Sequence, residues 1–272
     1  MSRYRARYCV FASALGISAL QSGAFADDAQ DLAKKLSNPV SSLISVPFQY
    51  NFDHRIGPDD DGSKHLINFQ PVVPVSLGAD WNVVVRTIVP IVSQDEIFPG
   101  AGDQSGLGDI TQSYFFTPKD SPGGFTWALG PVFLYPSGTD QLLTTDKWGA
   151  GPTGLLLQQT GPWTVGILAN HIWSLAGDET RSDVSSTFLQ PFISYTTADA
   201  WTFGINTEST YDWTAEAWSI PINLTATKLT KIGQQPISIG GGVRYWAESP
   251  DSGPEGFGAR AVLTFLFPTG GQ

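Results

Sequence analysis

The residues with catalytic potential that lie nearest one another in the chain are Asn170, His171 and Ser174. A histidine base beside a serine hydroxyl is the arrangement that lipases use, and it requires a hydrogen bond between the two side chains. The segment from Trp163 to Trp173 alternates apolar and polar residues, which is typical of a strand with two distinct faces. His171 then shares the apolar row with Trp173, whereas Ser174 lies on the other face. We therefore expect no catalytic residues, and a lipase is the least favoured function.

Metal and phosphate chemistry are not favoured either. The three histidines, His54, His65 and His171, are isolated from one another in the sequence, and Cys9 is the only cysteine. A zinc site needs several such ligands brought together. The glycines around Gly106-Leu107-Gly108 lack the Lys-Ser/Thr pair and the helix of a phosphate-binding loop. The sequence predicts no metal site and no cofactor.

A third set of chemically active residues consists of charges and amides on the polar rows of alternating segments. Rings of such side chains set the ion preference of a membrane pore. Alternatively, Arg244 and Arg260 pair with Glu208 or Glu248 and fill a narrow interior, and both interpretations stay open at this point. The candidates for residues that line a lumen are Arg86, Asn206, Glu208, Asn223, Arg244 and Arg260.

The elements that would position these residues are strands. Between Trp201 and Trp213 every second residue forms a largely apolar row with aromatic residues at both ends, and the intervening row contains Asn206 and Glu208. Aromatic rings at the two ends of apolar rows are typical of membrane-spanning barrels, where they lie at the two water interfaces. A charge on the lipid face costs about 2–4 kcal/mol at the bilayer midplane. The charged rows are therefore predicted to face the lumen.

The N-terminus carries an export signal. Basic residues precede a short apolar run and the motif Ala24-Phe25-Ala26, which predicts a signal peptide over residues 1–26 that is cleaved after Ala26. Residues 27–42 form a predicted periplasmic segment in which Ala29, Leu32, Ala33 and Leu36 have helical spacing. The formal net charge of −10 argues against a nucleic-acid partner.

Twelve strand candidates follow, joined by connections that alternate between short and generally longer. This asymmetry is typical of bacterial barrels, with short periplasmic turns and long external loops. We predict an all-β fold, a twelve-stranded antiparallel transmembrane β-barrel over residues 43–272 with a short N-terminal periplasmic helix or plug. The fourth, sixth and eighth candidates alternate poorly, and Pro221 predicts a bulge or a break in pairing. The candidates are residues 43–52, 64–77, 80–93, 107–117, 125–136, 147–159, 163–176, 184–197, 201–213, 217–229, 236–248 and 256–267.

Acidic residues are concentrated in the longer connections, as in Asp59-Asp60-Asp61. A solvated loop surface is the simpler interpretation. The alternative is a divalent-cation bridge to anionic outer-membrane lipid such as lipopolysaccharide.

From Asn38 onward the chain resembles an outer-membrane transporter family named for the meta-pathway of phenol degradation, some of whose members are mislabelled neuromedin U. The resemblance covers nearly the whole mature chain. It implies an outer-membrane barrel with a transport role, inserted by the barrel-assembly machinery, and no catalytic residues. Pro268 to Gln272 extend beyond the last strand, which departs from the family pattern. The motifs are Asn38-Pro39, Leu43-Ile44-Ser45-Val46-Pro47, Gly106-Leu107-Gly108-Asp109, Lys147-Trp148-Gly149-Ala150-Gly151-Pro152, Ala169-Asn170-His171-Ile172-Trp173-Ser174, Gln190-Pro191-Phe192 with Tyr195, and Leu263-Thr264-Phe265-Leu266-Phe267-Pro268.

The function that we expect is passive passage of small, weakly polar molecules, including aromatic ones, across the outer membrane. This expectation rests on the resemblance and on inner rows that mix polar residues with Val72, Val84, Ile88, Val132 and Leu134. The competing hypothesis is a non-transporting outer-membrane protein that displays its acidic loops or supports envelope integrity.

Overall fold

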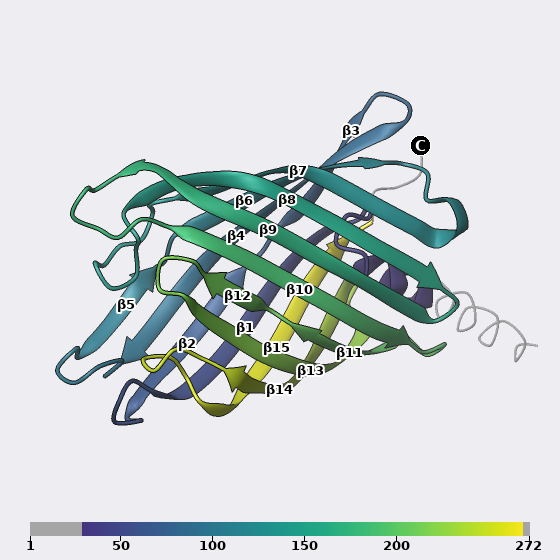
Figure 1. The fold of residues 1–272 in the computed structure, drawn as a ribbon. Helices are drawn as coiled ribbons and strands as arrows, with labels where there is room; N and C mark the ends of the chain where they lie inside the picture. The colour runs from purple at the N-terminus through teal and green to yellow at the C-terminus, as the bar shows by residue number, and fades with distance from the viewer. Residues whose placement is uncertain (1–28, 269–272) are drawn as a thin grey trace, which may run out of the picture.

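The computed structural model describes residues 29–268, so the predicted signal peptide and residues 269–272 lie outside the described part. One antiparallel sheet closes on itself through pairing of the first and last strands, β1 and β15 (Figure 1). Three of the predicted membrane strands are each divided in two, as β2 and β3, β5 and β6, and β11 and β12. Twelve strands therefore surround the lumen, and the fold prediction is confirmed. The strands are β1 Ile44–Ile56, β2 Gly62–Phe69, β3 Val72–Leu77, β4 Trp81–Asp95, β5 Asp103–Leu107, β6 Ile110–Pro118, β7 Phe125–Tyr135, β8 Lys147–Thr160, β9 Trp163–Gly177, β10 Ser185–Thr196, β11 Trp201–Thr207, β12 Ser209–Asp212, β13 Ala217–Ile232, β14 Gln235–Glu248 and β15 Gly256–Phe267.

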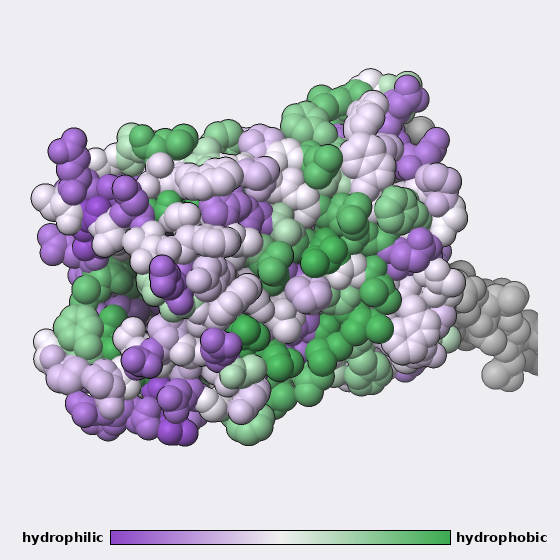
Figure 2. Space-filling view, in the orientation of Figure 1, coloured by the Kyte–Doolittle hydropathy of each residue, from purple (hydrophilic) through white to green (hydrophobic). Residues whose placement is uncertain are grey.

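The two faces of the wall follow the period of two. Trp201, Phe203 and Ile205 are 38%, 50% and 41% exposed, whereas Asn206 and Asn223 meet on the opposite face. On the face drawn in Figure 2, an apolar band crosses the half of the barrel nearer the short turns, and hydrophilic residues gather at the end with the long loops. The band matches the surface that a β-barrel presents to lipid. No helix among residues 29–268 is long and apolar enough to span a membrane.

Several strands extend further than the alternation predicts. β1 continues to Ile56 and β4 to Asp95, where Asp95 pairs with Asp103 of β5. About half of the residues of the predicted loops 53–63 and 94–106 are therefore strand, with turns at 57–61 and 96–102. Hairpin pairing continues above the apolar band because backbone hydrogen bonds do not depend on which side chains the lipid contacts.

Pro221 produces the predicted break. It lies opposite Glu208, since Thr207 pairs with Ile222 and Thr210 with Ser219 on either side. Proline has no N–H to donate to this ladder, so β11 ends at Thr207 and β12 begins at Ser209. The partner strand also shifts register between Ile220 and Pro221. The interruption places the Glu208 carboxylate at a point where the wall departs from regular pairing.

A helix over residues 29–36 precedes the barrel and lies at the end with the short turns. Ala29 and Ala33 pack on Leu229 of β13 and Leu266 of β15. On the other side, the Gln159 side chain of β8 donates a hydrogen bond of 3.0 Å to the carbonyl of Lys34. In the order of twelve strands, β8 and β15 lie six apart and therefore face each other across the lumen. We call residues 29–43 the plug segment because they cross the barrel interior.

Candidate functional site

In the lumen, Arg260 of β15 forms an ion pair with Glu208, which lies at the junction of β11 and β12. The two terminal nitrogens of Arg260 donate to the two carboxylate oxygens at 2.9 and 2.7 Å, and Nε donates to Asn51 at 2.7 Å. β13 and β14 separate the two residues in the wall, so this contact runs through the interior. The planar guanidinium matches a carboxylate in this two-bonded geometry, and Arg260 is only 4% exposed.

Arg244 of β14 connects Glu208 to a second acid. Its Nη1 lies 3.8 Å from Glu208, and its Nε lies 3.3 Å from Asp53 of β1. Asp53 also accepts a hydrogen bond from the indole of Trp246 at 2.8 Å, and that ring stacks near the Arg244 guanidinium. Of the two acids considered as partners from the sequence, Glu208 contacts both arginines and Glu248 is exposed.

Arg86 of β4 lies on the opposite side of the lumen from Glu208, six strands away. Its terminal nitrogen donates to the Gln70 side chain at 2.8 Å. The nearest acidic charge that acts on it is Glu208, yet no carboxylate of residues 29–268 lies within ion-pair distance. Among residues 29–268, the one hydrogen-bond partner of Arg86 is thus a neutral amide.

Asn206 and Asn223 meet on the inner face, where Asn223 donates to Asn206 at 2.9 Å. All six predicted lumen residues therefore lie on the inner face. Lys64 of β2 joins them, because it lies close enough to Asp53 and Arg244 to sense both charges. We call Asp53, Lys64, Arg86, Glu208, Arg244 and Arg260 the charged cluster.

Opposite most of the charged cluster, the inner face is apolar. On β8, for example, Leu155 and Leu157 point inward and are each 2% exposed, whereas Leu156 between them points outward and is 52% exposed. Val40 of the plug segment packs on this surface near the short turns. We call the inward apolar residues of β4 to β10 the apolar wall: Val84, Phe115, Ala128, Val132, Leu134, Leu155, Leu157, Leu168, Ile172, Phe188 and Phe192.

The loop between β7 and β8, residues 136–146, folds over the inner face of the wall at the opposite end. A Cβ at Gly106 would collide with Thr139, and one at Gly108 would press on Pro90 and approach the carbonyl of Leu143. Between Ile91 and Ile88 of β4 the partner strand advances one residue more, from Leu107 to Thr111. This bulge places Gly108 and Asp109 beneath the loop.

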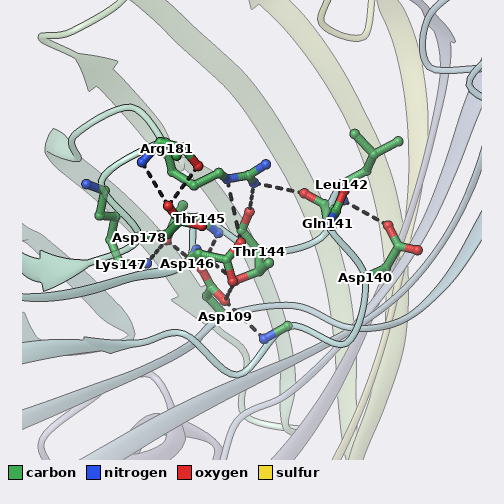
Figure 3. A network of polar contacts seen from close by, with 12 residues as sticks. Asp109, Asp140, Gln141, Leu142, Thr144, Thr145, Asp146, Lys147, Asp178 and Arg181 are labelled. Carbon is green, nitrogen blue, oxygen red and sulfur yellow. Dashed lines mark hydrogen bonds and ion pairs between the residues drawn. The ribbon is translucent and has the colours of Figure 1, made fainter.

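Asp109 fixes the loop through four hydrogen bonds. Its carboxylate accepts from the Gly138 amide, the Thr144 hydroxyl, and both the amide and the hydroxyl of Thr145, at 2.7 to 3.1 Å (Figure 3). The motif Gly106-Leu107-Gly108-Asp109 therefore supplies the space for the loop and the acid that holds it.

A second loop, residues 178–184, is joined to the first. Arg181 donates to the carbonyls of Gln141 and Thr144 and lies 3.6 Å from Asp146. Lys147 lies 3.0 Å from Asp183, and hydrogen bonds from Lys147 and Ser174 hold the pKa of Asp183 below its ordinary value. Since that carboxyl is ionised above the lowered pKa, this contact persists at neutral pH and weakens as the pH falls through it.

Asp109→Ala should release the loop over residues 136–146. Four hydrogen bonds to one carboxylate are lost, and local opening that exposes Leu143 becomes more frequent. Thermolysin should cut the refolded variant within this loop at least about tenfold faster than the unaltered protein. This factor corresponds to a modest fraction of the free energy that the lost hydrogen bonds to a charged group contribute. Asp140→Ala is the matched control, because that side chain accepts a hydrogen bond only from Leu142 within the loop. Equal resistance of both variants would contradict the role of Asp109.

His171 and Ser174 have separate partners. His171 Nδ1 lies 2.7 Å from the Thr187 hydroxyl, and its ring lies 4.0 Å from that of Trp173. The Ser174 hydroxyl instead donates to Asp183 at 3.1 Å. Residues 29–268 contain no group of three or more histidine, cysteine, aspartate or glutamate side chains that could hold a metal ion.

Comparisons with known proteins give the fold. The COG4313 outer membrane channel from Pseudomonas putida F1 superposes with a TM-score of 0.65 at 14% identity, covering 83% of this chain and 96% of that chain. The fold is that of an outer-membrane barrel. The KdgM porin covers 82% of this chain and 99% of its own at 12% identity, with a TM-score of 0.49. No protein-family model and no curated protein match the sequence.

The comparisons support the coarser part of the sequence interpretation. The matching barrel is an outer membrane channel, and the likeness gives this chain the fold of such a barrel. The resemblance to the phenol-pathway family remains a prediction, since these matches do not distinguish that family from other barrels.

Sequence reasoning missed Asp53, Lys64 and Asp109 as parts of the site. Asp53 continues the inward row of Gln49 and Asn51, and this parity was the available signal. It was overlooked because residues 53–63 were interpreted as a loop. The contacts of Asp109 depend on a loop conformation that alternation does not encode.

Proposed function

We propose that this protein is a passive outer-membrane channel for small, weakly polar organic molecules, including aromatic ones. The observation that carries the proposal is the asymmetric lumen, in which the apolar wall faces the charged cluster. An apolar surface takes up the body of such a solute with favourable loss of hydration, and the polar side keeps the path open to hydrogen-bonding groups. Passive passage requires weak binding, and neither side of the lumen needs to bind the solute tightly.

The dimensions of the lumen favour small solutes. Twelve strands lie between filled eight-stranded barrels and the open sixteen-stranded porins. The loop over residues 136–146 narrows one end, and the plug segment crosses the other. Passage then requires movement of the plug segment, because its helix contacts opposite sides of the wall.

Proteoliposome uptake tests the proposal. We expect protein-dependent entry of weakly polar aromatic solutes to exceed that of sugars of similar size, after subtraction of entry into protein-free liposomes. The panel contains phenolics, alkanes, sugars and amino acids. Acceleration of sugars without acceleration of phenolics would replace this proposal with a general hydrophilic porin. No acceleration of any solute would favour the non-transporting alternative.

A further inference from the structure

The inner face next to the plug segment contains a cavity of about 150 Å³. This volume lies below the roughly 300–1,000 Å³ of sites for drug-sized ligands, so the cavity suits a single small ring or a short chain. Its polar lining includes Gln70, Arg86 and Gln190 of the barrel wall, together with Ser45 of β1 and with Asn38 and Ser41 of the plug segment. Leu36, Leu43 and Val72 contribute apolar surface beside them.

Arg86 gives the cavity its chemical preference. A guanidinium has five N–H donors, and the only hydrogen bond of Arg86 within residues 29–268 goes to Gln70. Arg244 and Arg260, by contrast, contact carboxylates directly. An arginine with spare donors beside a cavity matches a planar carboxylate, which accepts two parallel hydrogen bonds from it.

The charge of the surrounding lumen also favours an anionic ligand. The charged cluster contains four cations, Lys64, Arg86, Arg244 and Arg260, against two acids, Asp53 and Glu208. Its formal charge is therefore positive, and the two acids are already engaged by Arg244 and Arg260. An anion that enters the cavity meets a cationic field in a partly desolvated space, where charge interactions are stronger than in bulk water.

We propose that Arg86, with Gln70 and Gln190, forms a binding site for small organic carboxylates, whose apolar body rests on Val72 and on the plug segment. This inference deepens the proposed function by adding a negative charge to the solute class. An inorganic anion satisfies the guanidinium equally well but leaves the apolar surfaces of Leu36, Leu43 and Val72 uncovered. The organic carboxylate is therefore the ligand that uses the whole lining.

Fluorine NMR titration of the refolded protein in detergent tests the site independently of transport. The probes are 4-fluorobenzoate and its neutral analogue 4-fluorobenzamide. The benzoate should bind at least about tenfold more tightly than the amide, and Arg86→Gln should remove that difference, as expected for loss of a charge-assisted hydrogen bond. Arg86→Lys keeps the charge without the planar fork of the guanidinium. Its preference for the benzoate should therefore be intermediate between those of the unaltered protein and Arg86→Gln. Arg55→Gln is the control, because Arg55 is an exposed arginine at the end of β1, where it is paired with Asp60 and Glu255.

The outcomes separate this site from the proposed function. Equal binding of the two probes, or unchanged benzoate binding by Arg86→Gln, overturns the carboxylate site. Displacement of 4-fluorobenzoate by an equal concentration of inorganic phosphate overturns the organic part of the inference. Arg86-dependent binding in a protein that accelerates no solute in proteoliposomes supports the site and refutes the channel.

Discussion

Glu208→Ala should destabilise the barrel by about 3–5 kcal/mol, the usual cost of removing one partner from a buried ion pair. The carboxylate accepts both terminal hydrogen bonds of Arg260 and lies 3.8 Å from Arg244. Arg260 and Arg244 are only 4% and 7% exposed, so water cannot easily replace the lost acid. Urea titration of the refolded barrel in lipid vesicles, followed by tryptophan fluorescence, measures the change.

A double-mutant cycle identifies the cause of this loss. Arg260→Ala in the Glu208→Ala background removes the guanidinium that would otherwise stay unpaired, so the double variant should be more stable than the sum of the single effects predicts. Thr202→Ala is a control on the adjoining β11 and the same inner face, where it removes no charge and only a hydrogen bond with Thr196. If Glu208→Ala unfolds at the same urea concentration as the unaltered protein, water in the lumen already solvates both arginines.

The strand pattern was predictable because one physical rule governs both faces of most strands. Lipid excludes charge from the outer row, and the charges of the inner row then identify the parity of the strand. Trp201 to Trp213 shows this directly, with aromatic residues outside and Asn206 and Glu208 inside. We predicted a closed barrel from the export signal, the aromatic residues at the ends of the apolar rows and the alternating lengths of the connections.

The strands that alternate poorly fail for an identifiable reason. In β8 and β10 the inner row is partly apolar, with Leu155 and Leu157 on one strand and Phe188 and Phe192 on the other. Contrast between the rows is therefore lost, although the backbone alternates normally. In β5 and β6 the bulge at Gly108 and Asp109 reverses the parity within one segment. Weak alternation in a barrel sequence thus marks the wall where the lumen is least polar.

The partners of the charged residues could not be predicted in the same way. Parity places Arg244, Arg260 and Glu208 inside the barrel, but it does not give their heights along the axis. Register and strand tilt determine that Arg260 reaches Glu208 across two intervening strands while Arg86 reaches only Gln70. The difference between a paired and an unpaired arginine therefore depends on the tertiary structure.

Removal of the helix over residues 29–36 should increase the single-channel conductance severalfold. The helix contacts β13 and β15 through Ala29 and Ala33 and contacts β8 through the Lys34 carbonyl, so it occupies the path at the end with the short turns. The strands pair with one another without it, and the shortened barrel should still show heat-dependent mobility on gels. Planar-bilayer recordings of both proteins measure the difference. Equal conductance would mean that solutes avoid the plug segment.

A reversible cross-link distinguishes movement of the plug segment from a path around it. Cys9 is the only native cysteine, so Lys34→Cys with Gln159→Cys in a chain refolded from residue 27 provides one reactive pair. Gln159→Cys removes the donor of the hydrogen bond to the Lys34 carbonyl, and the covalent bridge replaces that contact. A short, reducible bis-methanethiosulfonate bridge should abolish solute uptake, and reduction should restore it. Each single-cysteine variant controls for the modification itself. Uptake that continues through the bridged protein would show that the helix stays in place during transport and that solutes pass beside it, along the cavity at Arg86.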